Sequence, residues 1–426
     1  MTRTRKGHKE MKHKISKVLI LVFLTSMLSG CWDAIELNER LIITGLAFDP
    51  GEEPGVYHIS FQGAVSSEIS GGGGQGATPV FVFSGEGRTL QEVLSKMSQG
   101  VPKIISLSHV SVLIISDALA EQVGIGEFID FVERDPKTRI TMQVLIARET
   151  SAKNILTVTS PISSLTANNL VQKMNFTNRD YSHNFPSQID DVIRGMVIPG
   201  GGPTISGAVI KANKAAENEI DNGNMAESGS SKENVSTVLV PTFVSIDGVA
   251  LFKGDKLVGW TEGNEGLGLS MIRNKAKGSA INITCPEDGT GTIAINMNFS
   301  KSKVKGKIED GRPSFSIDIK QKGVISEAGC PVILNSGDVI QTYEKTWNEK
   351  TKEIILSTID KAQKSGTDVL EFGRVLEKDR SAQYKQWKEA EDWGEFFSRS
   401  KVEVNVQSII IHTQTRTNPY STGGED

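Results

Sequence analysis

Hydrophobic and polar positions alternate over short stretches in the first half of the chain. Five stretches are rich in β-branched and aromatic residues and short enough to be strands: 41–49, 56–65, 79–85, 106–116 and 138–148. Between them, two segments place apolar side chains three and four positions apart, as on one helix face: 88–99 and 126–135. The pattern then becomes helical until it breaks at the sequence IPGGGP, residues 198–203. An α/β region is predicted here.

The chain after residue 239 alternates tight turns with strand-like stretches. Gly, Asp and Pro, the residues that tight turns need, occur at 253–256, 286–291 and 309–313. This spacing predicts an antiparallel meander. A long amphipathic helix is expected next, followed by a second helix, a stretch with two tryptophans and a last strand: about 337–363, from Thr367, Trp387 and Trp393, and 401–412.

These elements predict an α+β protein of several domains, with mixed sheets flanked by helices and a C-terminal antiparallel meander with a long terminal helix. Residues 211–236 contain few large apolar side chains, too few to offset the entropy lost on ordering, so we expect this polar segment to be mobile. Because strand-like stretches flank it, it is either an excursion between two strands or an interdomain linker. The expected division is a signal peptide, an N-terminal α/β region of one or two subdomains, a strand with the polar excursion, a C-terminal α+β domain and a polar tail: 1–30, 31–203, 204–238, 239–416 and 417–426.

The N-terminus has the pattern of an export signal. Seven basic residues and one acidic residue precede a run of about eleven apolar residues, 18–28. A membrane-spanning helix needs roughly 20 apolar residues, so cleavage after export is the stronger interpretation. Both Met1 and Met11 are suitable starts, because the residues from Met11 onward already form a complete signal.

The apolar run ends in Leu28-Ser29-Gly30-Cys31, which has the form of a bacterial lipobox. In this interpretation the thiol of Cys31 receives a lipid and becomes the first residue of the mature protein. The alternative is an ordinary signal peptide with a chance cysteine. Two or more acyl chains on one residue anchor a protein stably, whereas one chain binds only marginally. We therefore expect a folded body that is tethered to a membrane through acylated Cys31.

Charge narrows the range of partners. Cleavage before Cys31 would leave 40 Lys and Arg against 50 Asp and Glu, a net charge of −10. An acidic body argues against nucleic acid and against anionic lipid as partners of the folded part.

Catalytic motifs are scarce. The sequence GGGGQG at 71–76 fits the dinucleotide-binding pattern, but it joins two expected strands and opens no helix, so it is interpreted as a loop. Each histidine after the signal stands alone. Asp190 and Asp191 are adjacent on an expected helix and point about 100° apart, which does not suit a catalytic pair or a metal site. We expect no enzyme, no cofactor and no metal.

Two further cysteines, Cys285 and Cys330, each end a strand-like run and precede a proline. If both strands belong to one sheet, a disulfide between them is expected after export. Two free, buried cysteines are the alternative, because sequence alone does not establish pairing.

The sequence GCWDAIELNER followed by ITGLAFD resembles the opening of the Ger(x)C lipoproteins, the C subunits of bacterial spore germinant receptors. The residues that carry the resemblance are Gly30, Cys31, Trp32, Asp33, Glu36, Leu37, Gly45 and Asp49. It continues at 248–272 and 364–379 and covers essentially the whole mature chain. The loop at 71–76 and the excursion at 211–236 are longer than the family pattern, so no binding surface is carried over there.

The resemblance implies a non-catalytic, lipid-anchored subunit on the outer face of the spore inner membrane. It would act with integral membrane subunits in the nutrient-triggered germination response. Neither the nutrient, nor direct nutrient binding, nor the interface residues, nor the oligomeric state follows from it. The alternative is a solute-binding lipoprotein of an uptake system, which would have two lobes of repeated βαβ units.

Overall fold

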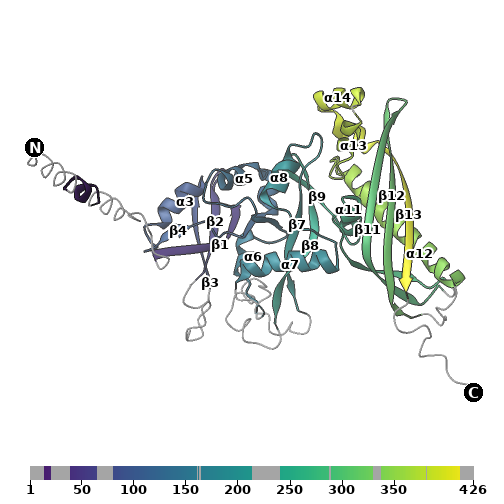
Figure 1. Cartoon of the computed structure of the whole chain (residues 1–426), viewed down its shortest axis with the longest axis horizontal. Helices are drawn as coiled ribbons and strands as arrows, with labels where there is room; N and C mark the ends of the chain where they lie inside the picture. Colours follow the sequence, from purple (N-terminus) through teal and green to yellow (C-terminus); the bar gives the residue numbers. More distant parts are fainter. Residues whose placement is uncertain are drawn as a thin grey trace, which may run out of the picture. The chain divides into compact units, whose positions relative to one another are not determined.

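The computed structural model describes residues 14–20, 39–64, 80–160, 162, 165–213, 240–286, 289–329, 337–379 and 381–412. The chain divides into two units, Met1–Arg40 and Leu41–Asp426 (Figure 1). In the first unit, residues 14–20 form a helix. Several predicted features lie outside the described residues: Cys31, Trp32, Asp33, Glu36, Cys330, the loop at 71–76, most of the polar excursion and the C-terminal tail.

The N-terminal part of the second unit is built on a mixed sheet. Among the described residues it has nine strands, in the order β3-β2-β1-β5-β6-β7-β8-β9, with β4 paired to β1. The strands β1, β5, β6 and β7 run parallel, and both ends of the sheet are antiparallel. The strands are β1 (Arg40–Pro50), β2 (Tyr57–Ala64), β3 (Val80–Gly87), β4 (Ile104–Ser106), β5 (Val112–Ser116), β6 (Gln143–Ala147), β7 (Thr204–Ala212), β8 (Thr242–Lys253) and β9 (Lys256–Trp260).

Helices cover both faces of this sheet, which explains why β5 and β6 are buried along their whole length. One face packs against α3 (Leu90–Met97), α4 (Asp117–Gln122), α5 (Gly126–Glu133) and α8 (Ile189–Met196). The other packs against α6 (Ala152–Thr157) and α7 (Thr166–Asp180). Figure 1 shows α5 and α8 on one side of the strands and α6 and α7 on the other.

The C-terminal part has a second sheet in the order β10-β11-β12-β13. One face of this sheet shares a core with α12, in which Tyr343 and Trp347 are fully buried. The elements of this part are β10 (Ser279–Thr284), β11 (Thr292–Glu309), β12 (Arg312–Ala328), β13 (Lys401–His412), α11 (Glu265–Ile272), α12 (Gly337–Lys364), α13 (Phe372–Lys378), α14 (Ala382–Glu389) and α15 (Trp393–Ser398).

The predicted α+β class is confirmed, as are helices at the positions of α3, α5 and α12 and the antiparallel order of β10 to β12. The last strand, β13, runs parallel to β12 because α12 to α15 carry the chain back to the same end of the sheet. The strand expected at 106–116 was wrong in extent. Only its second half, β5, forms a strand there, while β4 ends at Ser106, because a turn in which Val110 N–H donates to the Leu107 carbonyl lies between them.

The expected C-terminal domain starts at residue 239, yet β8 and β9 complete the N-terminal sheet. The strand β7, at the start of the expected excursion, pairs with both β6 and β8. The sequence showed strand-like segments on both sides of the excursion, but not which sheet they join, because a turn-rich strand pair has the same pattern in either sheet. In the described part of the chain, no helix has the length and apolar character needed to cross a membrane.

Candidate functional site

A cavity of about 230 Å³ lies where the N-terminal sheet meets the helices of the C-terminal part. One wall comes from α8 and the segments on either side of it, and the other from the residues after α11 and the start of α13. The charged residues that line it are Asp191, Arg194, Arg273, Lys275, Glu371 and Arg374.

The α8 wall is organised by the first turn of its helix. The backbone N–H of Gln188 donates to the Asp191 carboxylate in a capping box, and acidic residues are favourable at a helix N-terminus. Arg194 lies one turn later and pairs with Asp190 and Asp191, with N–O distances of 2.9 Å to each. Asp190 and Asp191, which were expected to point about 100° apart, thus share one guanidinium.

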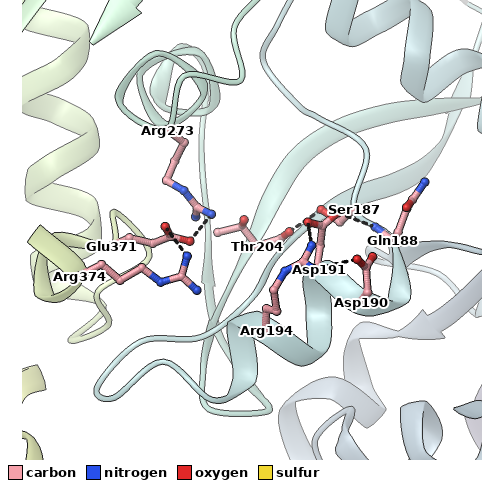
Figure 2. A network of polar contacts seen from close by, with 9 residues as sticks. All are labelled: Ser187, Gln188, Asp190, Asp191, Arg194, Thr204, Arg273, Glu371 and Arg374. Atoms are coloured by element: carbon pink, nitrogen blue, oxygen red, sulfur yellow. Dashed lines mark hydrogen bonds and ion pairs between the residues drawn. The ribbon is translucent and has the colours of Figure 1, made fainter. Parts of the chain in front are cut away.

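The opposite wall is organised around Glu371. This residue has a left-handed backbone (φ 61°) and precedes α13. Its carboxylate pairs with Arg273 through one oxygen and with Arg374 through the other. Arg273 also donates to the Val369 carbonyl at 2.9 Å. Figure 2 shows this group facing the α8 group, with Thr204 between them in the view.

Arg273 is the least solvated cation of the cavity. Its side chain is 17 per cent exposed, and that of its partner Glu371 is 21 per cent exposed. Burial lowers the pKa of the Arg273 guanidinium, and the Glu371 carboxylate opposes this shift. Burying a charged pair costs solvation on both partners, so such a pair is poor evidence for stability alone.

The segment IPGGGP, at which the predicted helical pattern ended, joins the two walls. The Gly200 carbonyl accepts a hydrogen bond from Asp368 N–H at 2.9 Å, and the Gly201 carbonyl accepts one from Gly254 N–H at 2.7 Å. A Cβ on Gly202 would lie 2.0 Å from the Phe252 carbonyl oxygen. Backbone contact is therefore so close here that a side chain at residue 202 does not fit.

Asp368 holds the start of α13 in place but does not line the cavity. Its buried carboxylate accepts hydrogen bonds from the backbone N–H groups of Phe372 and Gly373 and from the indole of Trp393. Burial raises the pKa of Asp368, and these three donors oppose the shift. The segment 364–379 and the tryptophan-containing stretch, both noted in the sequence, therefore meet at one carboxylate.

Two residues of the family motif, Asp49 and Gly45, have structural roles in the N-terminal sheet. Asp49 is buried at the end of β1 and accepts from the backbone N–H groups of Ala152 and Lys153, at 2.7 and 2.9 Å. Burial raises the pKa of Asp49, against the effect of these bonds. A Cβ on Gly45 would lie 2.8 Å from the Leu156 side chain, so glycine lets α6 approach β1.

Cys285 is buried and takes part in a disulfide. Its predicted partner, Cys330, lies outside the described residues, so the pairing stays a prediction. Cys31, Trp32, Asp33 and Glu36 also lie outside them. Among the described residues, no three His, Cys, Asp or Glu side chains are grouped so as to hold a metal ion.

The cavity arginines were not singled out in the sequence. Arg194 follows Asp190 and Asp191 by four and three positions. This spacing indicates ion pairs along one helix face and can be recognised in the sequence. Glu371 and Arg374 lie in the segment 364–379 that carries part of the family resemblance. They meet Arg273 because the fold brings the end of α11 to the start of α13, which no local pattern shows.

Two family models match the chain, one for each part. Residues 33–210 match the spore germination protein N-terminal domain. Residues 247–414 match the C-terminal domain described as spore germination B3/GerAC like. Together they cover most of the chain after the expected signal.

Full-length relatives agree with these matches. The chain is 25% identical to spore germination protein KC of Bacillus subtilis (strain 168), over 96% of this chain and 98% of the relative. It is 23% identical to spore germination protein B3 of the same organism, over 94% of this chain and 98% of the relative.

A solved structure supports the fold. The crystal structure of the GerBC protein superposes with a TM-score of 0.51 and 19% sequence identity, covering 86% of this chain and 97% of that chain. The solute-binding lipoprotein considered as an alternative gains no support from any of these matches. The chain belongs to the Ger(x)C family of spore germination proteins.

Proposed function

We propose that the protein is a lipid-anchored, non-catalytic subunit of a spore germinant receptor, required for the nutrient-triggered response together with integral membrane subunits. The observation that carries the proposal is the match of both family domains in one chain, at 33–210 and 247–414. The first match begins two residues after Cys31, where the lipobox ends.

The anchor would hold the body on the outer face of the spore inner membrane. Residues 32–39 separate Cys31 from the first residue of β1, Arg40. Even fully extended, this tether spans roughly 30 Å. The folded body would therefore stay close to the bilayer and to the membrane subunits with which it acts.

A non-catalytic role agrees with the chemistry of the cavity. A nucleophile needs an adjacent base, but the hydroxyl of Ser187, which lines the cavity, donates to the Thr204 carbonyl at 2.8 Å. The charged groups around it are Lys275 and three arginines, each arginine paired with a carboxylate of its own wall, an arrangement suited to binding.

The anchor is tested with Cys31→Ala in sporulating cells supplied with labelled palmitate. We expect loss of label, loss of the protein from the inner-membrane fraction and a weak response to nutrients, since membrane affinity depends on the acyl chains. Thr25→Ala, a change within the apolar run, is the matched control and should leave all three unchanged. Equal labelling of Cys31→Ala and wild type would refute the anchor.

Partnership is tested separately. The membrane subunits should co-purify with the tagged wild-type protein from spore inner membrane. Recovery of the protein without any integral membrane partner, under conditions that preserve other membrane complexes, would contradict the receptor role.

A further inference from the structure

We propose that the cavity between α8 and α13 is a binding site for a small oxyanion, a carboxylate or phosphate group, held by guanidinium groups from both walls. The proposal rests on the geometry of the cavity alone and goes beyond the receptor role, so the two can fail independently.

The first argument is charge. Four cations line the cavity, Arg194, Arg273, Lys275 and Arg374, against the carboxylates of Asp191 and Glu371. Among the side chains that line the cavity, cations therefore outnumber carboxylates by four to two, which favours an anion there. Asp190 does not line the cavity but pairs with Arg194. With Asp190 included, the cations still outnumber these carboxylates by four to three.

A fourth carboxylate, that of Asp368, acts on Arg273 through space but is hydrogen-bonded to groups outside the cavity. Both of its oxygens accept hydrogen bonds from α13 and Trp393. It is fully buried and does not line the cavity. It therefore makes no contact with a ligand in the cavity, although its charge acts on Arg273.

The second argument is donor geometry. A guanidinium has five N–H donors in a planar fork that matches carboxylate and phosphate oxygens. The ion pair with Glu371 uses one guanidinium nitrogen of Arg374. The pairs with Asp190 and Asp191 use two guanidinium nitrogens of Arg194. N–H groups thus remain on both walls for a ligand between them.

A purely structural ion-pair network is the competing explanation. Such a network would join the two walls directly, whereas each arginine named here pairs with a carboxylate of its own wall (Figure 2). The walls are joined instead by backbone hydrogen bonds of the glycine segment. The ion pairs hold the guanidinium groups in place beside the cavity.

The size limits the ligand. At about 230 Å³ the cavity is smaller than the roughly 300–1,000 Å³ typical of sites for drug-sized molecules. Phe185, Pro186 and Ile198 add apolar surface. The site therefore fits a single anionic group with at most a short organic part.

The experiment is isothermal titration calorimetry on the full-length protein with inorganic phosphate and, separately, acetate. Ionic strength is held constant with chloride, because screening alone changes exposed charges. We expect saturable binding of at least one anion. Phosphate binding alone would identify a phosphate ligand, and acetate binding alone a carboxylate; binding of both would identify the shared oxyanion chemistry.

Three cavity variants, Arg194→Gln, Arg374→Gln and Lys275→Gln, should each bind about tenfold more weakly or worse, since a lost charged hydrogen bond has at least that effect. Lys275 is exposed, so its variant keeps the test valid if an arginine variant does not fold. The control is Arg134→Gln, which removes an exposed guanidinium paired with Asp130 on α5 and should bind like wild type. Absence of saturable heat with both anions, or wild-type affinity in all three cavity variants, overturns the proposal.

Discussion

Trp393 donates its indole N–H to the carboxylate of Asp368 at 2.9 Å, with both side chains buried. The indole also contacts the ring of Tyr384 edge-on, with centroids 5.0 Å apart. This bond joins α15 to the start of α13, and thereby fixes Glu371 and Arg374 beside the cavity.

Trp393→Phe should destabilise the protein by about 1–3 kcal/mol, because it leaves a buried carboxylate with one donor fewer while keeping an aromatic ring. The measurement is the free energy of unfolding by denaturant. Trp387→Phe is the matched control, since Trp387 stacks on Phe396 and makes no bond to Asp368. Equal losses in the two variants would mean that ring volume, and not the hydrogen bond, determines the effect.

The raised pKa of Asp368 predicts a specific pH dependence. Burial raises this pKa above the ordinary value of 3.8, so the native state holds the proton more tightly than the unfolded chain does. The stabilisation from this group is complete below about 3.8 and is lost as pH rises through the folded pKa. Asp368→Asn should therefore flatten the fall of unfolding free energy with rising pH above 3.8. Denaturant titrations at several pH values measure it; identical slopes in variant and wild type would contradict the raised pKa.

The predicted disulfide between Cys285 and Cys330 gains support from its flanking residues. Cys285 N–H donates to the Gly291 carbonyl, and Gly329 N–H donates to the Thr292 carbonyl, both at 2.9 Å. The chain entering Cys330 therefore lies beside the same end of β11 as Cys285.

A bridge there closes a loop of about 45 residues and would stabilise the fold by roughly 4 kcal/mol on the chain-entropy estimate. Non-reduced peptide mapping should yield a cross-linked Cys285–Cys330 peptide, and reduction should lower the melting temperature. Alkylation of both thiols in the unreduced, folded protein would exclude the bridge.

Helices whose apolar residues recur at helical spacing over several turns could be predicted from the sequence. The 28-residue helix α12 was predicted because apolar residues such as Tyr343, Trp347, Ile355 and Ile359 recur along it at helical spacing. The short helix α4 was missed, since six residues carry too little periodicity and its cap, Ser116, also ends a strand. Pairings between distant segments, such as β13 with β12, leave no trace in either strand's own sequence.

The cavity was harder to predict than the fold, because it too depends on contacts between segments that are distant in the sequence. Arg273 and Arg374 are each an ordinary charged residue at the edge of a helix, and they become a site only because both reach Glu371. Net charge also says little at this scale. The expected body carries −10, yet four cations and two carboxylates line this cavity.

The close backbone contact at Gly202 gives a last prediction. A Cβ there would lie 2.0 Å from the Phe252 carbonyl oxygen and 2.9 Å from the Phe252 Cβ, so Gly202→Ala forces the glycine segment away from β8. Overpacking of this kind costs about 1–3 kcal/mol, which a thermal or denaturant unfolding curve measures. Gly337→Ala is the control, because among the described residues no atom beyond its chain neighbours and its own helix backbone lies within 4 Å of the Cβ it would add. Since Gly202 also lines the cavity, the variant should move the α8 wall and weaken anion binding along with stability. Wild-type stability in Gly202→Ala would mean that the segment relaxes freely and does not hold the two walls together.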